Sequence, residues 1–300
     1  MTPPTPIRER WRGTMTDRER FNNQMHYRPV DRCFNMEFGY WNENFTRWKL
    51  FVDNDVHDNA AADVLFNFDT IDKIDICIWM NPVFEERVVD ETETGRILVN
   101  VDGLLAEVPK DDHDTIPHYI KATVEKPDDW KRCKEERFRL DDPARVIDVE
   151  ALKRQHPPDR AYPLGVPCGS MIGRIRNMLI FEGLAYAQYD YPDMVEHGLD
   201  QVLGEIDFDY AFGWEGISFK SGPIVSLDFF ERVVVPRYRR IGDKLNAHGS
   251  ICGTPTATAP SGRCCRDSWR RASIVCSRMR STAARTRLPC CRSTERTCAS

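Results

Sequence analysis

Two groups of residues carry side chains suited to acid–base chemistry. Glu37, Tyr40 and Trp41 follow an apolar stretch, and a glutamate in aromatic surroundings can have a raised pKa and act as a general acid or base. Glu215 follows Trp214 at the end of another apolar stretch. Two carboxylates facing one pocket would suit acid–base catalysis or a cationic ligand. The alternative is that these are ordinary loop carboxylates beside core aromatics.

Basic residues nearby are candidates for binding substrate carboxylates. Lys220 follows Glu215 closely, so it either binds a carboxylate or forms a salt bridge to Glu215 that fixes the loop. The glycine-containing segment 165–176 lacks the Gly-Lys-Ser/Thr ending of a phosphate-binding loop, and its glycines favour a tight strand-to-helix turn. Arg174 and Arg176 would lie at the start of that helix. They would either anchor carboxylates or form surface ion pairs.

The elements that would position these residues alternate between strand and helix. The predicted strands are residues 33–37, 71–80, 162–166, 206–214 and 248–252. The predicted helices between them are residues 41–51, 128–137, 148–155, 172–206 and 230–245, the last divided at Pro236. Such alternation predicts a parallel α/β architecture. A closed eightfold barrel needs about 250 residues, so this stretch would form five or six units of a TIM (β/α)8-type barrel that is incomplete at its C-terminal end.

A different pattern interrupts the alternation after the second predicted strand. Residues 84–89, 96–101 and 104–108 are rich in β-forming residues, and Asp102-Gly103 between the last two is a strong hairpin signal. We therefore predict an inserted β-meander. Before the first strand, Thr16 and Glu19 have the spacing of a helix capping box. The proline-rich residues 1–14 are predicted to be an unstructured leader, with Met15 as an alternative start.

The last 48 residues differ from the rest in composition. The whole chain has a formal net charge of −5, but residues 253–300 contain ten arginines, six of the 11 cysteines and only two acids. Their charge is therefore +8, and that of residues 1–252 is −13. An acidic body argues against nucleic acid as a partner. Reading residues 268–280 in a shifted frame permits the string LEAGVNCLFPHE, so we predict a disordered tail translated out of frame, in preference to a zinc module or a basic nucleic-acid-binding tail.

Five short motifs resemble sequences of the uroporphyrinogen decarboxylase superfamily, which also contains corrinoid-linked methyltransferases. Residues 15–21 (MTDRERF) and 29–32 (PVDR) are similar to its N-terminal sequence. Residues 213–215 (GWE), 220–223 (KSGP) and 235–238 (VPRY) are similar to an uncharacterised branch of that superfamily. The resemblance implies a TIM barrel with its pocket at the carboxyl ends of the strands.

The resemblance, which covers residues 15–252, implies cofactor-free decarboxylation of tetrapyrrole acetate side chains, with the protonated pyrrole as electron sink. The superfamily has an arginine-rich loop after the first strand, where this chain has residues 37–41, and an aspartate after the second, where the nearest residue is Asn81. The predicted catalytic residues are Glu37, Tyr40 and Glu215. The predicted substrate-binding residues are Trp41, Asn81, Arg174, Arg176, Trp214 and Lys220.

The methyltransferase branch implies an alternative with zinc as cofactor and a corrinoid protein as partner. Its His-x-Cys zinc motif is similar to the region around His248 and Cys252, although His248 stands four residues before the cysteine. These two residues are either metal ligands or buried strand residues. An inactive, truncated product is a third alternative. Under the main hypothesis the partner is a small molecule bearing carboxylates, with a homodimer compatible and neither nucleic acid nor membrane expected. Scattered single cysteines predict a cytoplasmic protein.

Overall fold

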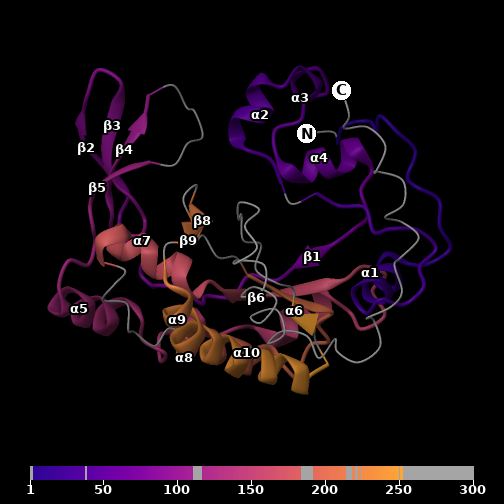
Figure 1. The fold of residues 1–300 in the computed structure, drawn as a ribbon. Helices are drawn as coiled ribbons and strands as arrows, with labels where there is room; N and C mark the ends of the chain where they lie inside the picture. Colours follow the sequence, from indigo (N-terminus) through magenta and orange to yellow (C-terminus); the bar gives the residue numbers. More distant parts are fainter. Residues whose placement is uncertain are drawn as a thin grey trace.

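A four-stranded parallel sheet runs through the middle of the chain (Figure 1). The computed structural model describes residues 3–37, 39–110, 117–183, 192–213, 218–219, 222–223, 225–249 and 251–252. The sheet has the order β1 (Asp72–Lys73), β6 (Leu164–Gly169), β7 (Tyr210–Gly213) and β10 (Ile251–Cys252). Neighbouring strands are separated by long connections that include helices, as parallel pairing requires.

The strand predicted at residues 71–80 is only partly paired. The ladder covers β1, and the Ile74 N–H continues it by donating to the Gly165 carbonyl at 3.0 Å. The chain then keeps the alternation of a strand, because Ile74 and Ile76 are buried in the main core while Asp75 between them is exposed. The predicted strand is therefore present as an extended segment, but its paired part is much shorter than predicted.

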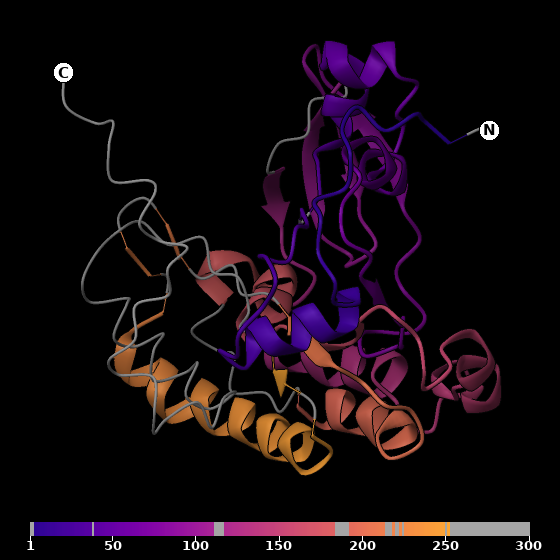
Figure 2. The same ribbon diagram turned by 90° about the vertical axis from the view of Figure 1, so that its right-hand side faces the viewer.

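One face of the sheet is covered by α8 (Pro192–Val202) and α10 (Val235–Ala247), which lie below it in Figures 1 and 2. The predicted apolar face of α10 is confirmed, since Tyr238, Ile241 and Leu245 are all buried. The long helix predicted at residues 172–206 corresponds to α7 (Met171–Gly183) and α8, with residues 184–191 outside the described part.

Pro236 opens the second helical stretch, as predicted, but no break separates this stretch from the first. It lies at the first turn of α10, where its missing N–H leaves no hydrogen bond unmade. However, α9 (Leu227–Phe229) continues directly into α10 through a π-helical turn at Phe230–Val234. A wider turn just before a proline relieves the clash between its ring and the preceding carbonyl, so the helix passes the proline without a break.

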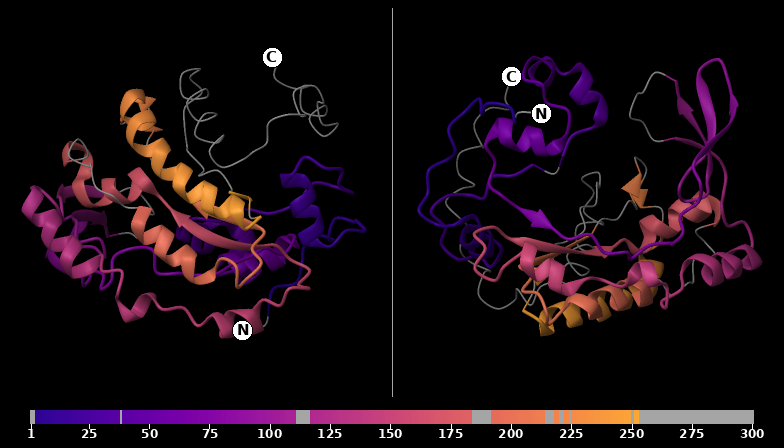
Figure 3. Two further views of the ribbon diagram at one scale, coloured as in Figure 1. Left: turned by 90° about the horizontal axis from the view of Figure 1, so that it is seen from below. Right: turned by 180° about the vertical axis from the view of Figure 1, so that it is seen from behind.

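The predicted meander is an antiparallel sheet. It contains β2 (Arg87–Glu91), β3 (Gly95–Val99), β4 (Leu105–Pro109) and a fourth strand, β5 (His118–Lys121), that the sequence did not indicate. It extends away from the parallel sheet in both Figure 1 and Figure 3. A further pair of short strands, β8 (Ser218–Phe219) and β9 (Gly222–Pro223), forms a third sheet. None of the three sheets in the described residues closes on itself, so the barrel stays a prediction.

Three short helices form a second unit with its own apolar cluster. These are α2 (Asn42–Arg47), α3 (Lys49–Asp53) and α4 (Asn59–Phe66), and we call residues 42–66 the helical lobe. Its cluster, separate from the main core, consists of Phe45, Phe51, Val56, Ala62 and Leu65. The helical lobe and the meander lie at opposite ends of the same side of the molecule, as the views from the front and from behind agree (Figures 1 and 3).

The amino-terminal region contains one confirmed helix and one missing strand. Helix α1 (Asp17–Met25) begins at Thr16 with both hydrogen bonds of the capping box. The strand predicted at residues 33–37 is wrong, because this segment pairs with no strand; the Asn35 N–H instead donates to the Asp69 carboxylate at 2.9 Å. Residues 3–14 contain neither helix nor strand, but they make specific contacts that are described below.

The remaining helices are polar and lie at the surface, as predicted. They are α5 (Pro127–Arg137), which begins with a proline in its first turn, and α6 (Val149–Gln155), which is capped by Asp148. Within the described residues, no helix has the length and apolar character needed to cross a bilayer. The residues called a disordered tail, 253–300, lie outside the described part.

Candidate functional site

A buried carboxylate links three parts of the chain: the meander, α7 and residues 72–80, which begin with β1 and which we call the β1 segment. Asp102 is 7% exposed and accepts a hydrogen bond from the Trp79 indole nitrogen at 2.8 Å and one from the Asn177 amide at 3.3 Å. The guanidinium carbon of Arg174 lies 5.0 Å from the centre of the Trp79 ring, and Arg176 donates to the Asn177 amide oxygen at 3.2 Å. We call these five residues the Asp102 cluster.

Three elements bring the cluster together. Trp79 lies near the end of the β1 segment, and α7, which carries Arg174, begins right after β6, so both come from the carboxyl ends of parallel strands. Asp102 is placed by the turn between β3 and β4, where the Asn100 side chain accepts from the N–H groups of Asp102 and Leu104 at 3.0 and 2.9 Å. The carboxyl edge of a parallel sheet is where α/β proteins bind ligands.

Arg174 is the member of the cluster best suited to bind an anion. It is half-buried and lies over the Trp79 ring, and within the described residues it forms no ion pair with a carboxylate. A guanidinium presents donors in a planar fork that matches a carboxylate. The cluster therefore combines a cation able to bind a carboxylate with a buried carboxylate able to accept N–H groups.

Asn81 lies two residues beyond Trp79, but its side chain is hydrogen-bonded to a residue outside the Asp102 cluster. Its side-chain amide donates to the Asp142 carboxylate at 2.8 Å, and this bond is the main cause that lowers the pKa of Asp142. Its backbone N–H donates to the Arg137 carbonyl at 2.7 Å. The structure thus gives the Asn81 amide group a role in holding the chain near residue 142.

Arg145 supports the cluster and was missed by the sequence analysis. It is 2% exposed, and its guanidinium donates to the carbonyls of Cys77 and Trp79 at 2.8 and 2.7 Å and to those of Arg137 and Arg139 at 3.0 and 2.8 Å. These hydrogen bonds therefore hold the backbone at Trp79, the residue whose side chain contacts both Asp102 and Arg174. Nothing in its local sequence distinguishes it from a surface arginine.

Tyr40 packs against the apolar cluster of the helical lobe and does not belong to the Asp102 cluster. Its ring packs edge-on against Phe51, with centres 4.9 Å apart, and near Phe66. Burial raises the pKa of Tyr40, and the charges of Glu37 and Asp63 raise it further, so the hydroxyl stays protonated at neutral pH. The alternative of an aromatic packing role is the one that the structure favours for Tyr40.

Glu37 and Trp41, predicted to work with Tyr40, are both exposed, Trp41 at 62%. Glu37 also adds to the effect of burial in raising the pKa of Asp63, so Glu37, Tyr40 and Asp63 influence one another electrostatically. Tyr40 packs against the apolar cluster of the helical lobe, whereas Arg174 lies over Trp79 beside the main core, so the two do not form one site in this structure.

The other predicted site residues are described only in part. Trp214, Glu215 and Lys220 lie outside the described residues, although Gly213, immediately before them, ends β7 beside Gly169 at the carboxyl edge.

The two candidate metal ligands lie on different elements. His248 is an exposed residue at the C-terminal end of α10, not in a strand, and Cys252 lies in β10, in register with Ala211. No group of three or more potential metal ligands occurs in the described part of the chain.

A second buried carboxylate lies at the opposite, amino end of the sheet. Asp209, just before β7, accepts from Arg18 at 2.7 Å, from Arg160 at 2.8 Å and from Asn22 at 2.7 Å. Burial alone would raise the pKa of Asp209, but these hydrogen bonds lower it overall. Since ligands bind at the other edge, we assign this network to holding α1 on the sheet.

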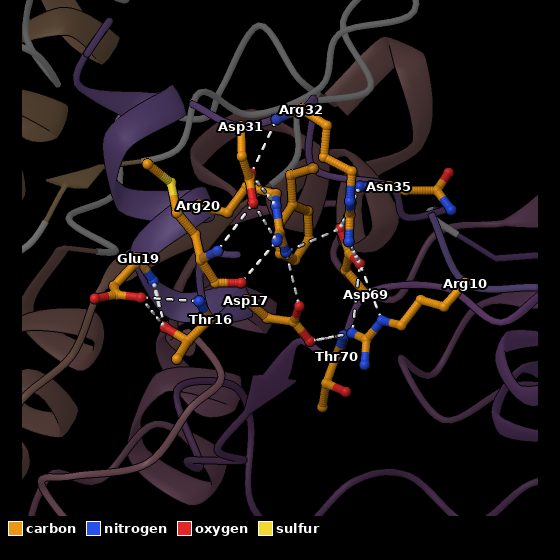
Figure 4. Close-up of polar contacts among 12 residues, drawn as sticks. Arg10, Thr16, Asp17, Glu19, Arg20, Asp31, Arg32, Asn35, Asp69 and Thr70 are labelled. Carbon is orange, nitrogen blue, oxygen red and sulfur yellow. Dashed lines mark hydrogen bonds and ion pairs between the residues drawn. The ribbon is translucent and has the colours of Figure 1, made fainter. Parts of the chain in front are cut away.

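A larger ion network joins α1 to the segment before β1 (Figure 4). Arg20 is buried and bonds to Asp31 at 2.8 Å and to Asp17 at 3.0 Å, while Arg32 bonds to Asp69 at 2.6 and 2.7 Å. The acidic and basic groups compensate each other, as expected for a structural network. Its members include residues of the motifs at 15–21 and 29–32, but the sequence did not indicate that they pair, because they come from separate segments.

Comparisons with protein-family models, with curated proteins and with solved structures found no match for this chain.

Proposed function

We propose that the Asp102 cluster binds a small substrate bearing carboxylates, and that the protein is a uroporphyrinogen decarboxylase-like carboxy-lyase acting on tetrapyrrole acetate side chains. The observation that carries the proposal is Arg174, a half-buried cation at the carboxyl edge of the sheet that has no carboxylate partner among the described residues. The reaction itself comes from the resemblance of the motifs in residues 15–252.

We also propose that the parallel sheet is part of a (β/α)8-type barrel. The four parallel strands and the helices between them have the order expected of part of a (β/α)8-type barrel. The side with the Asp102 cluster would be the mouth of that barrel, where the loops after each strand meet. The amino edge would carry only structural contacts, such as the Asp209 network.

The proposed chemistry needs a charged pyrrole and an ordered substrate. Protonation of a pyrrole ring carbon makes the ring an electron sink, the bond between the acetate methylene and its carboxylate breaks, and the electron pair enters the ring as CO2 leaves. The methylene carbon then takes a proton and becomes a methyl group, and the ring loses its added proton. Arg174 and Arg176 would hold other substrate carboxylates. Asp102 would accept a pyrrole N–H in the way it now accepts the indole N–H of Trp79.

The test is direct turnover by the full chain. With uroporphyrinogen under anaerobic conditions we expect release of CO2 and formation of less carboxylated porphyrinogens. Arg174→Ala should lower the rate at least about tenfold, the cost of losing one charge-assisted hydrogen bond. Arg132→Ala, which removes an exposed arginine from α5, is the matched control.

Two results would count against the proposal. A folded chain that neither binds nor decarboxylates uroporphyrinogen would overturn it, as would equal activities of the Arg174 and Arg132 variants. Bound zinc together with turnover of a methylated corrinoid would replace it by the methyltransferase alternative.

A further inference from the structure

Residues 3–14, which we call the strap, cap the end of the last helix of the helical lobe. The Ile7 N–H donates to the Leu65 carbonyl at 2.9 Å, and the Arg8 side chain donates to the Phe66 carbonyl at 2.6 Å. In return, the Asn67 side chain donates to the Arg8 carbonyl at 3.3 Å. The last carbonyls of a helix have no partner within it, so the strap satisfies groups that α4 leaves open. A cation at this end also interacts favourably with the helix dipole.

The middle of the strap reaches the ion network that holds α1 (Figure 4). Arg10 forms an ion pair with Asp17 of α1 and lies 3.4 Å from the Asp69 carboxylate, just before β1. Asp17 also accepts from the Thr70 N–H at 2.8 Å. One arginine of the strap thus connects α1 to the segment through which the helical lobe joins the sheet.

The far end of the strap is fixed to Asp31. The N–H groups of Thr14 and Met15 donate to one oxygen of Asp31 at 2.6 and 2.9 Å. Gly13 lies so close to this site that a Cβ atom there would be 2.7 Å from the Arg20 guanidinium. The strap is therefore held at residues 7–8, at Arg10 and at Thr14, mainly by polar groups.

The unit that the strap holds has an apolar cluster of its own. The helical lobe has a hydrophobic cluster separate from the main core, so apolar burial does not hold the two together as one core. The chain enters and leaves the lobe through residues 33–41 and 67–71, which contain neither helix nor strand in the described part. Such segments can absorb a change of backbone angles while the units that they join stay intact.

We propose that the strap is a latch, and that its release lets the helical lobe open as a unit while the parallel sheet stays folded. The latch depends on two kinds of contact: the Ile7 and Arg8 bonds to the end of α4, and the Arg10 ion pairs to Asp17 and Asp69. Removing either kind weakens the latch without touching either apolar core. A chain that begins at Met15 lacks both.

Hydrogen exchange of the full chain tests the latch, since it measures the helical lobe and the sheet in the same sample. In Ile7→Pro, which removes the N–H donor, and in Arg10→Ala, we expect amides of α4 to exchange at least about tenfold faster than in the unmodified chain. Amides of β6 and α10 should be unchanged. A variant without residues 1–14 should show the largest acceleration in the helical lobe.

Matched controls separate the latch from general effects of the substitutions. Thr5→Pro and Arg12→Ala introduce the same changes at exposed strap residues without the contacts described above, and they should exchange like the unmodified chain. The proposal is overturned if both Ile7→Pro and Arg10→Ala leave α4 exchange unchanged. It is also overturned if β6 amides accelerate equally, because strap, lobe and sheet would then be one cooperative unit. If the chain without residues 1–14 does not fold, the point variants decide.

Discussion

The indole nitrogen of Trp79 donates to the buried carboxylate of Asp102 at 2.8 Å, which ties the β1 segment to the turn between β3 and β4. This bond holds the turn of the inserted meander beside the carboxyl edge of the parallel sheet. The same carboxylate accepts from Asn177 of α7, so one side chain joins three elements.

Trp79→Phe should destabilise the protein, because it keeps an aromatic ring but leaves a buried carboxylate oxygen without its donor. We expect a loss of about 1–3 kcal/mol in the free energy of unfolding, measured by urea titration. Trp48→Phe, at an exposed tryptophan of the helical lobe, should change stability by less than about 0.5 kcal/mol. Equal effects of the two substitutions would contradict a structural role for the Trp79–Asp102 bond.

Asp209→Ala should have a much larger effect than Asp207→Ala, although both residues pair with Arg18. The side chains of Asp209 and Arg160 are 2% and 1% exposed, and removing one partner leaves a buried charge without compensation, at a cost of about 3–5 kcal/mol. The Asp207 side chain is 62% exposed, and such pairs contribute about 0–1 kcal/mol. Chemical unfolding of both variants gives the comparison.

Stability should fall steeply in acid because of Asp31 and Asp69. The hydrogen bond from Arg20 holds the pKa of Asp31 far below its usual range, and hydrogen bonds from Arg32 and Asn35 lower that of Asp69 in spite of its burial. A carboxyl group with a lowered folded-state pKa contributes stability above its unfolded pKa of about 4 and loses it as pH falls further. Urea midpoints measured from pH 6 to pH 2 should therefore drop below pH 4, and less so in Asp31→Asn.

Asp63 should behave in the opposite way. Asp63 is exposed, but partial loss of its hydration and the charge of Glu37 raise its pKa, so the folded state slightly favours the protonated form and the ionised carboxylate weakly opposes folding at neutral pH. Asp63→Asn should therefore stabilise the helical lobe modestly at pH 7, and the gain should vanish as pH falls through the raised pKa. Thermal melting at pH 7 and pH 3 checks this; a variant less stable than the parent at pH 7 would refute it.

Gly165→Ala should disturb the centre of the sheet. A Cβ atom at this position would lie 2.6 Å from Cε2 of Tyr210 on the neighbouring strand, so the ring must move. Overpacking of this kind costs about 1–3 kcal/mol. The double variant Gly165→Ala/Tyr210→Leu should recover part of the loss, and a double-mutant cycle measures the coupling. Strictly additive effects would contradict the steric explanation.

Local patterns in the sequence predicted much of the secondary structure. The capping box at Thr16, the hairpin signal at Asp102-Gly103 and the apolar face of α10 are all present. Each depends on residues within one or two turns of chain, and such short-range preferences act before any tertiary contact forms. The missing strand at residues 33–37 shows the limit, since a tertiary contact, the bond between Asn35 and Asp69, replaced a ladder there.

The candidate site was only partly predictable. Arg174 and Arg176 were identified from their place after a glycine-containing turn, but Trp79 and Arg145 were not, and Asp102 was recognised only as a turn residue. What gives Asp102 its importance is a bond to Asn177, 75 residues away. Conversely, Tyr40 was predicted to be catalytic because it lies near Glu37 and Trp41 in the sequence, yet its ring packs against Phe51 of the helical lobe.

The sequence by itself determined the alternation of parallel strands and helices between residues 71 and 252, the inserted meander and the acidic character of residues 1–252. Only the tertiary structure decided which charged groups meet, such as Arg18 with Asp209, 191 residues apart. The physical reason is that period and turn chemistry are properties of neighbouring residues, whereas a buried ion pair or a ligand site needs distant segments to be brought together by packing. That packing brought Asp102 and Arg174 into contact with the same side chain, Trp79, and placed Tyr40 against a different apolar cluster.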